Sequence, residues 1–274
     1  MRELRDKVAV VTGAASGIGR SVALLLADKG CHLALVDMQR DALAETAAQV
    51  LAHGRKVSQH VVDVSSRSAM SALPDAVLAQ HGCVDVMVNN AGIASGYTFE
   101  DHPIEHFERI IGVNFSGVVY GCKFFLPHLK QRPEAHIVNV SSMFGLLGFP
   151  TQAAYSASKF AVRGFSQVLW VELAPTPVRV TCVYPGGVNT NLVRTSPGWE
   201  HGVEVAQQQF DQVVKRTPEQ AARRIVRAIE RNTPNLRLGV ESYVVDWMKR
   251  LFPNAPHRIM ASLLRRQTKQ EPRA

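Results

Sequence analysis

Apolar runs and helix-like stretches alternate along most of the chain, and this alternation limits the possible folds more than any other feature. The apolar runs are near-continuous Val, Ile and Leu, which is typical of strands buried on both faces. Predicted strands cover Lys7–Thr12, His32–Asp37, Lys56–Val62, Val84–Asn89, Ala135–Val140, Val178–Tyr184 and residues 235–240. Predicted helices cover Gly17–Lys29, Gln39–His53, Ser66–Gln80 and Gln152–Leu173, and helical segments are predicted within Pro103–Gln131. The alternation predicts an α/β fold, a doubly wound parallel sheet flanked by helices on both faces.

Residues 186–216 break this alternation with Gly, Asn, Pro and mixed polarity. We expect a long, mobile excursion there, because long loops in compact domains are usually functional or disordered. Thr217, Pro218 and Gln220 then predict the start of a further helix, through a capping box with proline in the first turn. The sequence contains no internal repeat, low-complexity tract or linker, so a single domain is expected.

Several classes of protein are disfavoured by what the sequence lacks. The apolar run Val8–Val11 is too short for a signal peptide, and no stretch approaches the length of a membrane-spanning helix, so we expect a soluble protein. The cysteines show neither metal-ligand spacing nor the density of a secreted scaffold, which indicates reduced thiols in the cytoplasm. HExxH and GxSxG are both absent, which argues against zinc and serine hydrolases, and no metal site is expected.

The formal charge of +8 is concentrated at the C-terminus. Residues from Trp247 to Ala274 include seven Lys or Arg and one Glu, which leaves only +2 for the rest of the chain. A nearly neutral body argues against a nucleic-acid enzyme with a basic groove. Apolar residues interleaved with bases in this tail would suit an amphipathic helix on a membrane surface. We favour the simpler interpretation, a helix packed on the body followed by a solvated basic end.

A glycine-rich turn, TGAASGIG, follows the first predicted strand and contains Gly13, Gly17 and Gly19. A strand that turns sharply into a helix presents free backbone N–H groups, and the helix dipole favours a pyrophosphate there. The spacing differs from GxGxxG, but Asp37 ends the second strand 18 residues beyond Gly19. A carboxylate at that place accepts hydrogen bonds from the ribose hydroxyls of an adenosine and repels a 2′-phosphate. The pattern therefore favours NAD over NADP.

From about residue 5 to residue 240, the sequence resembles the short-chain dehydrogenase/reductase family. Thr12–Gly19 matches the TGxxxGxG cofactor cradle, and NNAG (Asn89–Gly92) matches the segment that closes the fourth strand. YSASK (Tyr155–Lys159) matches the family's tyrosine and lysine, one helical turn apart, and YPGG (Tyr184–Gly187) matches the segment that holds the nicotinamide amide. Several motifs in the family's order imply a Rossmann-like dinucleotide-binding fold.

The resemblance implies four catalytic residues, which are Asn114, Ser142, Tyr155 and Lys159. Tyr155 is the general base in oxidation and the acid in reduction, and Lys159 also hydrogen-bonds the nicotinamide ribose. Ser142, 13 residues before Tyr155, holds the substrate oxygen, and its neighbour Ser141 is the less favoured candidate. Asn114, in GVNFSG, supports a water that leads protons from Lys159 to solvent.

The pairing of Tyr155 with Lys159 has a physical reason. A secondary alcohol gives a hydride to a nicotinamide only when its hydroxyl proton leaves, and a phenol with a pKa of about 10 is a poor base at neutral pH. The positive nicotinamide and the Lys159 ammonium both favour the phenolate, so we expect a lowered pKa for Tyr155.

The same resemblance implies the residues that bind the cofactor, with Asp63 near the adenine. The implied set is Gly13, Ser16, Gly17, Ile18, Gly19, Asp37, Asp63, Val64, Asn90, Ala91, Gly92, Tyr155, Lys159, Pro185, Gly186, Val188 and Thr190. Family members that prefer NADP tend to carry basic residues where this chain has Ser16 and Met38, which again favours NAD. Arg20 and Arg40 lie nearby in the sequence and could still meet a phosphate.

Apolar side chains gather where the family's substrate pocket begins. They are Met143, Phe144, Leu146, Leu147 and Phe149, with Leu192, Val193, Trp199 and Phe210 in the excursion. Ordinary core packing and subunit contacts explain them equally well. We expect an NAD-dependent oxidoreductase that interconverts a lipophilic secondary alcohol and a ketone. The alternatives are a 3-oxoacyl reductase acting on acyl-carrier thioesters and a non-catalytic, nicotinamide-binding regulatory protein.

The family commonly assembles as dimers or tetramers through its long helices, so we expect a homodimer or homotetramer. Residues 1–241 are predicted to form the dinucleotide-binding catalytic domain, including the substrate loop 186–216. Residues 242–274 are predicted to form a C-terminal helical, basic extension outside the shared pattern.

Overall fold

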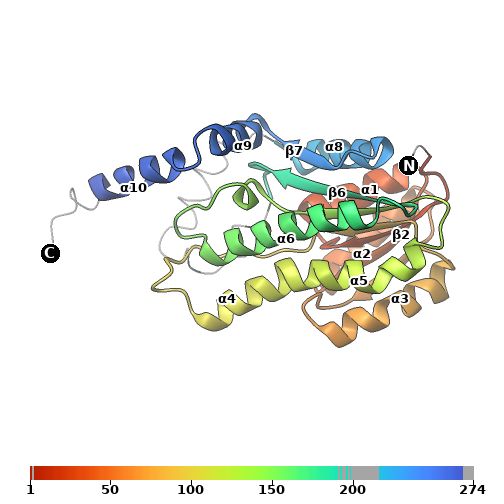
Figure 1. The fold of residues 1–274 in the computed structure, drawn as a ribbon. Helices are drawn as coiled ribbons and strands as arrows, with labels where there is room; N and C mark the ends of the chain where they lie inside the picture. Colours follow the sequence, from red (N-terminus) through yellow and green to blue (C-terminus); the bar gives the residue numbers. More distant parts are fainter. Residues whose placement is uncertain (2, 191, 193–195, 197, 199–215, 268–274) are drawn as a thin grey trace.

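The computed structural model describes the chain except residues 2, 191, 193–195, 197, 199–215 and 268–274 (Figure 1). Seven parallel strands form one sheet in the order β3-β2-β1-β4-β5-β6-β7. The strands are β1 (Val8–Thr12), β2 (His32–Asp37), β3 (Val57–Val61), β4 (Val86–Asn89), β5 (Ala135–Val140), β6 (Val178–Pro185) and β7 (Asn235–Leu238). The α/β prediction is confirmed, and every predicted strand is present.

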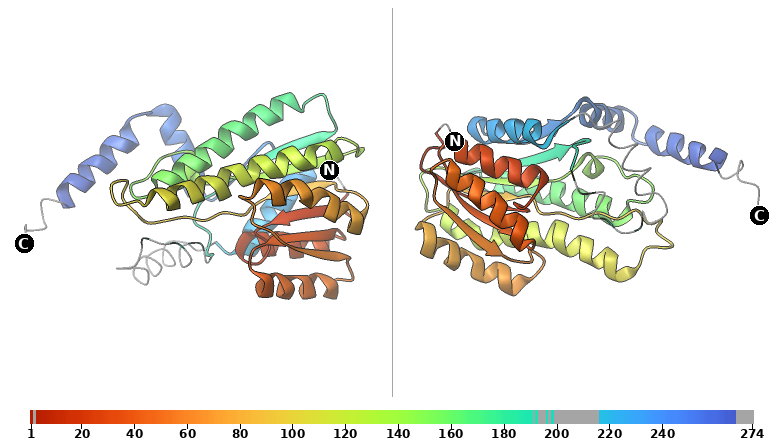
Figure 2. Two further views of the ribbon diagram at one scale, coloured as in Figure 1. Left: turned by 90° about the horizontal axis from the view of Figure 1, so that it is seen from below. Right: turned by 180° about the vertical axis from the view of Figure 1, so that it is seen from behind.

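Helices cover both faces of the sheet, as predicted (Figure 2). One face packs on α1 (Gly17–Asp28), α2 (Arg40–Ala52) and α8 (Pro218–Arg231). The other packs on α3 (Arg67–His81), α5 (Gly117–Leu129) and α6 (Ala153–Glu172). The strands are apolar in succession because the residues of each strand point alternately into these two cores.

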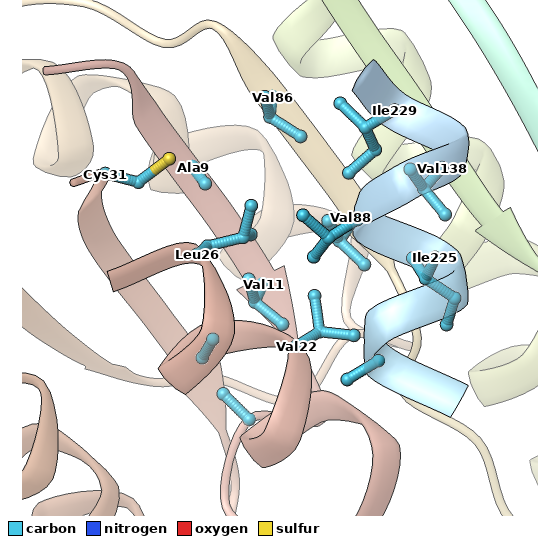
Figure 3. Packing of buried hydrophobic residues seen from close by; sticks show 14 of the residues in the cluster. Ala9, Val11, Val22, Leu26, Cys31, Val86, Val88, Val138, Ile225 and Ile229 are labelled. Carbon is cyan, nitrogen blue, oxygen red and sulfur yellow. The ribbon is translucent and has the colours of Figure 1, made fainter. Parts of the chain in front are cut away.

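The core beneath α1 and α8 shows this packing directly (Figure 3). Val22 and Leu26 of α1 meet Ile225 and Ile229 of α8 over Val88 of the sheet, and all five side chains are fully buried. Helix α8 begins with the predicted capping box. Gln220 N donates to Thr217 Oγ1 at 3.3 Å, and Gln220 Oε1 accepts from Thr217 N at 3.2 Å.

The helical segments predicted within Pro103–Gln131 are present. They are α4 (Ile104–Ile111), a π-helical turn η1 (Gly112–Ser116) and α5, which follow one another without a break. The combined run Ile104–Leu129 is long and apolar enough for a membrane span, so the prediction that no stretch approaches that length is wrong. Phe125 and Leu129 are fully buried against the sheet, as in the core helix of a globular domain.

Two further helices follow β7, α9 (Val240–Leu251) and α10 (Ala255–Gln267). Helix α9 packs beside the short 3-10 helix η2 (Met143–Gly145), whereas α10 extends away from the body (Figures 1 and 2). The predicted boundary at residues 241 and 242 therefore falls within the first turn of α9. Most of the excursion 186–216 lies outside the described residues.

The core packing makes a prediction about stability. Leu26→Ala should lower the free energy of unfolding by about 2–5 kcal/mol, because it removes a fully buried side chain and leaves a cavity. Leu51→Ala, at a leucine of α2 that is 59% exposed, should change it by less than about 0.5 kcal/mol. Urea denaturation of both variants measures the difference, and equal losses would contradict this description of the core.

Candidate active site

The turn between β1 and α1 is built for close approach of backbone to a ligand. Gly13 has a φ of +66°, which favours glycine, and a Cβ on Gly19 would lie 2.0 Å from the Gly13 carbonyl oxygen. Ser16 is the N-cap residue of α1, but its side chain makes no capping hydrogen bond. The first N–H groups of α1 are therefore left for an anion, and the helix dipole favours one there.

Thr12 fastens this turn to the end of β4. Its Oγ1 accepts from Asn90 N at 3.0 Å and from Ala91 N at 3.1 Å. Asn90 Nδ2 in return donates to the carbonyl oxygens of Thr12 and Gly13, at 3.0 and 3.3 Å. The cradle motif included Thr12, but its role as a double acceptor between two strands was not predicted from the sequence.

Asp37 lies at the end of β2, next to the turn. Its Oδ2 accepts from Ala15 N and its Oδ1 from Gln39 N, both at 3.0 Å. Arg20, which could have met a phosphate, instead donates to Ala42 O at 3.0 Å and contacts Glu45 at 3.2 Å. The carboxylate of Asp37 therefore sets the charge at this end of the site.

Asp63 is held by a partner that sequence reasoning missed. Arg109 of α4 donates to Asp63 Oδ2 at 2.7 Å, and Ser65 N and Oγ donate to Oδ1 at 2.9 and 2.7 Å. Burial raises the pKa of Asp63, but the hydrogen bonds from Arg109 and Ser65 outweigh it and leave the pKa below its usual value. Val64 beside it is buried against Gly117. Asp63 is thus a carboxylate at neutral pH.

Asn114 lies in the π-helical turn η1 and is fully buried. Its amide nitrogen donates to Ile93 O at 2.9 Å and to Ser158 Oγ at 3.1 Å, and its Oδ1 accepts from Ile93 N at 2.8 Å. A π-helical turn inserts an extra residue and is frequent at functional sites. A Cβ on Gly92 would lie 3.3 Å from Asn114 Oδ1 and 3.5 Å from Lys159 Nζ, so the three residues meet.

Ser142, Tyr155 and Lys159 come together between β5 and α6. The Ser142 hydroxyl lies beside the Tyr155 phenol and favours its ionised form. The Nζ of Lys159 lies 5.6 Å from the centre of the Tyr155 ring and donates to Val140 O at 2.9 Å. The two side chains share one face of α6, as their spacing of one helical turn predicts. All three are buried, so solvent does not screen their interactions.

Burial governs how the two titrating groups ionise. It lowers the pKa of Lys159 to about 8, and the nearby Cys182 thiol has a smaller, opposite effect. Burial also raises the pKa of Tyr155, and the hydrogen bond with Ser142 only partly compensates. For the protein's own groups, burial therefore keeps the pKa of Tyr155 above its usual value. The predicted lowering includes the positive charge of a bound nicotinamide, so it stays a prediction for the complex with the cofactor.

Ser141 and Ser142 have separate tasks. Ser141 Oγ donates to the main-chain carbonyl of Lys159 at 2.8 Å and is buried in that contact. A Cβ on Gly145 would lie 2.4 Å from the same Oγ, so the turn closes tightly over it. Ser142 faces Tyr155 instead, and accepts from Phe144 N at 3.2 Å. The structure places Ser141 as an anchor for α6 and Ser142 beside the reacting groups.

The segment after β6 closes the site from the other side. Gly186 N donates to Leu238 O at 2.8 Å, and Gly187 N donates to Glu241 Oε1 at 3.1 Å. Val188 is buried. A Cβ on Gly17 would lie 3.3 Å from Thr190 Cγ2, so this segment meets the glycine-rich turn. Glu241 also pairs with Arg216 at 3.0 Å, a support that sequence reasoning missed.

Aromatic and aliphatic side chains border the reacting groups. The Phe144 ring lies edge-on to Tyr155, with centroids 5.7 Å apart, and Phe149 lies 4.4 Å from Phe144. Leu146 and Leu147 are buried in a cluster with Met248 of α9 and Met260 of α10. Of the four apolar residues predicted in the excursion, Leu192 is described, and Val193, Trp199 and Phe210 lie outside the described residues.

The predicted site residues therefore assemble along the carboxyl edge of the sheet. The order of strands reverses between β1 and β4, which is where ligands bind in open parallel sheets. The open helix terminus, the close glycines and the Asp37 carboxylate fit a dinucleotide, and the buried phenol and ammonium lie farther along the same edge. No cluster of metal ligands occurs among the described residues.

Comparison with known proteins defines the class. The family model for short chain dehydrogenases matches residues 7–201. A candidate oxidoreductase of Mycobacterium tuberculosis, SadH, is 41% identical over 266 residues, which cover 96% of each chain. The chain belongs to the short chain dehydrogenase family, and it is an enzyme of the oxidoreductase class.

Solved structures agree with this class. A short chain dehydrogenase/reductase from Burkholderia phymatum in complex with NAD has a TM-score of 0.84 and is 30% identical, covering 91% of this chain and 95% of its own. An NAD+-bound xylitol dehydrogenase has a TM-score of 0.77 and is 28% identical, covering 85% of this chain and 98% of its own. Since that relative is named for a polyol, the shared fold does not fix the substrate.

The buried Lys159 makes a prediction about stability and pH. In the folded chain its pKa is about 8, below the ordinary 10.5, so below pH 8 the protein bears the full cost of a buried charge. Lys159→Met should therefore raise the free energy of unfolding at pH 7 by about 1–3 kcal/mol, after the loss of the Val140 hydrogen bond is included.

This gain should shrink as the pH rises from 8 to 10.5, because the folded wild type then loses its proton and the cost disappears. Urea denaturation of both proteins across that range measures the difference between their free energies of unfolding. The other titrating groups contribute equally to both proteins, so their effects cancel in this difference. A variant that is no more stable than wild type at pH 7 would contradict the proposed cost of burying Lys159.

Proposed function

We propose that this protein is an NAD-dependent dehydrogenase or reductase that interconverts a lipophilic secondary alcohol and a ketone. The observation that carries the proposal is the position of the Tyr155 phenol. It is buried, beside Ser142, near Lys159 and edge-on to Phe144. A proton donor with an apolar border suits a carbonyl carbon that bears apolar groups.

Each residue has a distinct task in this reaction. The nicotinamide, when bound, accepts or supplies the hydride. Ser142 orients the substrate oxygen beside the Tyr155 hydroxyl, which takes the alcohol proton in oxidation and returns it in reduction. Lys159 passes that proton on, because its pKa of about 8 lets it gain or lose a proton near neutral pH. Asn114, in the π-helical turn, supports the route from Lys159 to solvent and fixes the backbone of Ile93 beside it.

The carboxylate of Asp37 supports NAD as the cofactor. It lies at the end of β2, where it can accept hydrogen bonds from the ribose hydroxyls, and a 2′-phosphate would meet its charge. Arg20 is engaged with Glu45 and Ala42, so it is poorly placed to neutralise the 2′-phosphate of NADP. The NAD-bound Burkholderia relative supports the same choice.

Assembly and location extend the proposal. Val168, Trp170 and Val171 are exposed on α6, which suits an interface in a homodimer or homotetramer. The described cysteines are free thiols, which suits the reducing cytoplasm. The placement of Tyr155 beside Ser142 and Lys159 favours catalysis over a purely regulatory role, since a sensor needs no proton donor beside the nicotinamide.

Removing one hydroxyl tests the reaction. Tyr155→Phe should lower kcat/KM by about 10²–10⁴-fold with a lipophilic secondary alcohol and NAD, because the proton acceptor is lost. Tyr120→Phe, on α5 and stacked on Phe124, is the matched control and should keep wild-type activity. Absorbance at 340 nm measures both. A variant Tyr155→Phe as active as wild type would contradict the proposed role. Higher kcat/KM for polyols than for lipophilic alcohols would contradict only the substrate class.

Removing one charge tests the cofactor. The kcat/KM of the wild type should be higher with NAD than with NADP. Asp37→Asn should lower the ratio of kcat/KM with NAD to kcat/KM with NADP by about 10–100-fold, because repulsion of the 2′-phosphate disappears. Asp41→Asn removes an exposed carboxylate nearby on α2 and should leave the ratio unchanged. If wild type used both cofactors equally, the preference for NAD would be refuted.

A further inference from the structure

The C-terminal helices α9 and α10 leave large apolar side chains exposed. They are Val240, Val244, Trp247, Leu251, Phe252 and Ile259, each more than half exposed. Single exposed apolar residues are common, but a contiguous set on one element usually marks an interaction surface. We refer to these six residues as the apolar stripe.

Helix geometry groups most of the stripe on one side of α9. Val240, Val244, Trp247 and Leu251 follow one another at intervals of four, three and four residues, which places them along one line of the helix. The other side of α9 carries Val245 and Met248, which pack in the cluster of Leu146 and Leu147. The fold therefore already satisfies the inner side, and the stripe on the outer side plays no part in the described core.

Helix α10, which contains Ile259 of the apolar stripe, extends away from the body. Its first turns contact the rest of the protein through the buried Pro256 and through Met260. Beyond them the helix continues outward from the sheet and its covering helices in every view (Figures 1 and 2). Ile259 therefore lies on a helix that projects from the catalytic body, next to the exposed end of α9.

The charges around the stripe are mainly positive. Between Val240 and Gln267 the sequence has five Lys or Arg and two acidic residues. Both acids are engaged with arginines. Asp246 is buried and lies 2.5 Å from Arg237 and 3.2 Å from Arg250, and Glu241 lies 3.0 Å from Arg216. The surface that remains around the stripe is cationic and apolar.

We propose that α9 and α10 dock on the surface of an anionic membrane. The apolar stripe would enter the boundary between headgroups and acyl chains, and the exposed Arg258 of α10 would meet lipid phosphates. A second copy of this chain suits the surface less well, because two such stripes would bring their like charges together. The proposal goes beyond the enzymatic function, and the packed inner side of α9 would hold the catalytic body at that surface.

Sedimentation with vesicles tests the proposal on the full chain. Wild type should sediment with vesicles that contain phosphatidylglycerol and remain in solution with pure phosphatidylcholine. Trp247→Ser with Leu251→Ser should lower the partition coefficient at least about tenfold, because it removes the two central apolar side chains. Leu51→Ser is the matched control. Leu51 is 59% exposed near the end of α2, Leu251 is 64% exposed at the end of α9, and only the α9 change should affect binding.

The charge requirement is tested by a second pair of variants. Arg258→Glu should weaken binding, and Arg227→Glu on the exposed side of α8 should not. Raising the salt concentration should also weaken wild-type binding. The proposal fails if wild type does not bind anionic vesicles, or if the Trp247 and Leu251 variant binds as well as wild type. It also fails if that variant instead lowers the molar mass in light scattering, which would assign the stripe to a second copy.

Discussion

Parallel strands all end at the same edge of a sheet, and every part of this active site depends on that constraint. The chain leaves β1 for α1 on one face and leaves β4 for α4 and α5 on the other, so the two connections diverge at the point where strand order reverses. The divergence would also let the strand ends separate. The reciprocal hydrogen bonds between Thr12 and Asn90 hold them together, so the glycine-rich turn keeps its place beside NNAG.

Lys159 is the group that this edge holds at the greatest cost. An ammonium only 3% exposed loses its hydration, and it regains one hydrogen bond from the Val140 carbonyl. The surrounding fold fixes it from two sides. Ser141 anchors its main chain, and Asn114 lies across Gly92 from its Nζ. The desolvation that destabilises the charge also moves its pKa toward neutrality, which is where a group that relays a proton is most effective.

The sheet and the identity of the site could be predicted from the sequence because both depend on local signals. Runs of apolar residues define doubly buried strands, and short motifs at their ends converge wherever such strands are parallel. Other features depend on tertiary contacts. Arg109 reaches Asp63 across 46 residues, and nothing in the spacing of either indicates the pair. The π-helical turn at Asn114 was missed because one inserted residue hardly changes apolar periodicity.

The burial of the Tyr155 phenol could not be predicted for a related reason. Sequence reasoning could count the charges near the phenol, but it could not measure burial, and burial dominates in the folded chain.

Helix α9 connects the two surfaces of this protein that have unusual chemistry. Its inner side packs through Val245 and Met248 against the apolar residues that follow Ser142, and Phe144 in that segment lies edge-on to Tyr155. Its outer side carries the apolar stripe. Binding of the apolar stripe to a membrane would therefore place the border of the proposed substrate site near the bilayer. A lipophilic substrate dissolved in a membrane would then reach the enzyme at the side where α9 holds it, and the separate proposals for substrate class and docking surface meet in one helix.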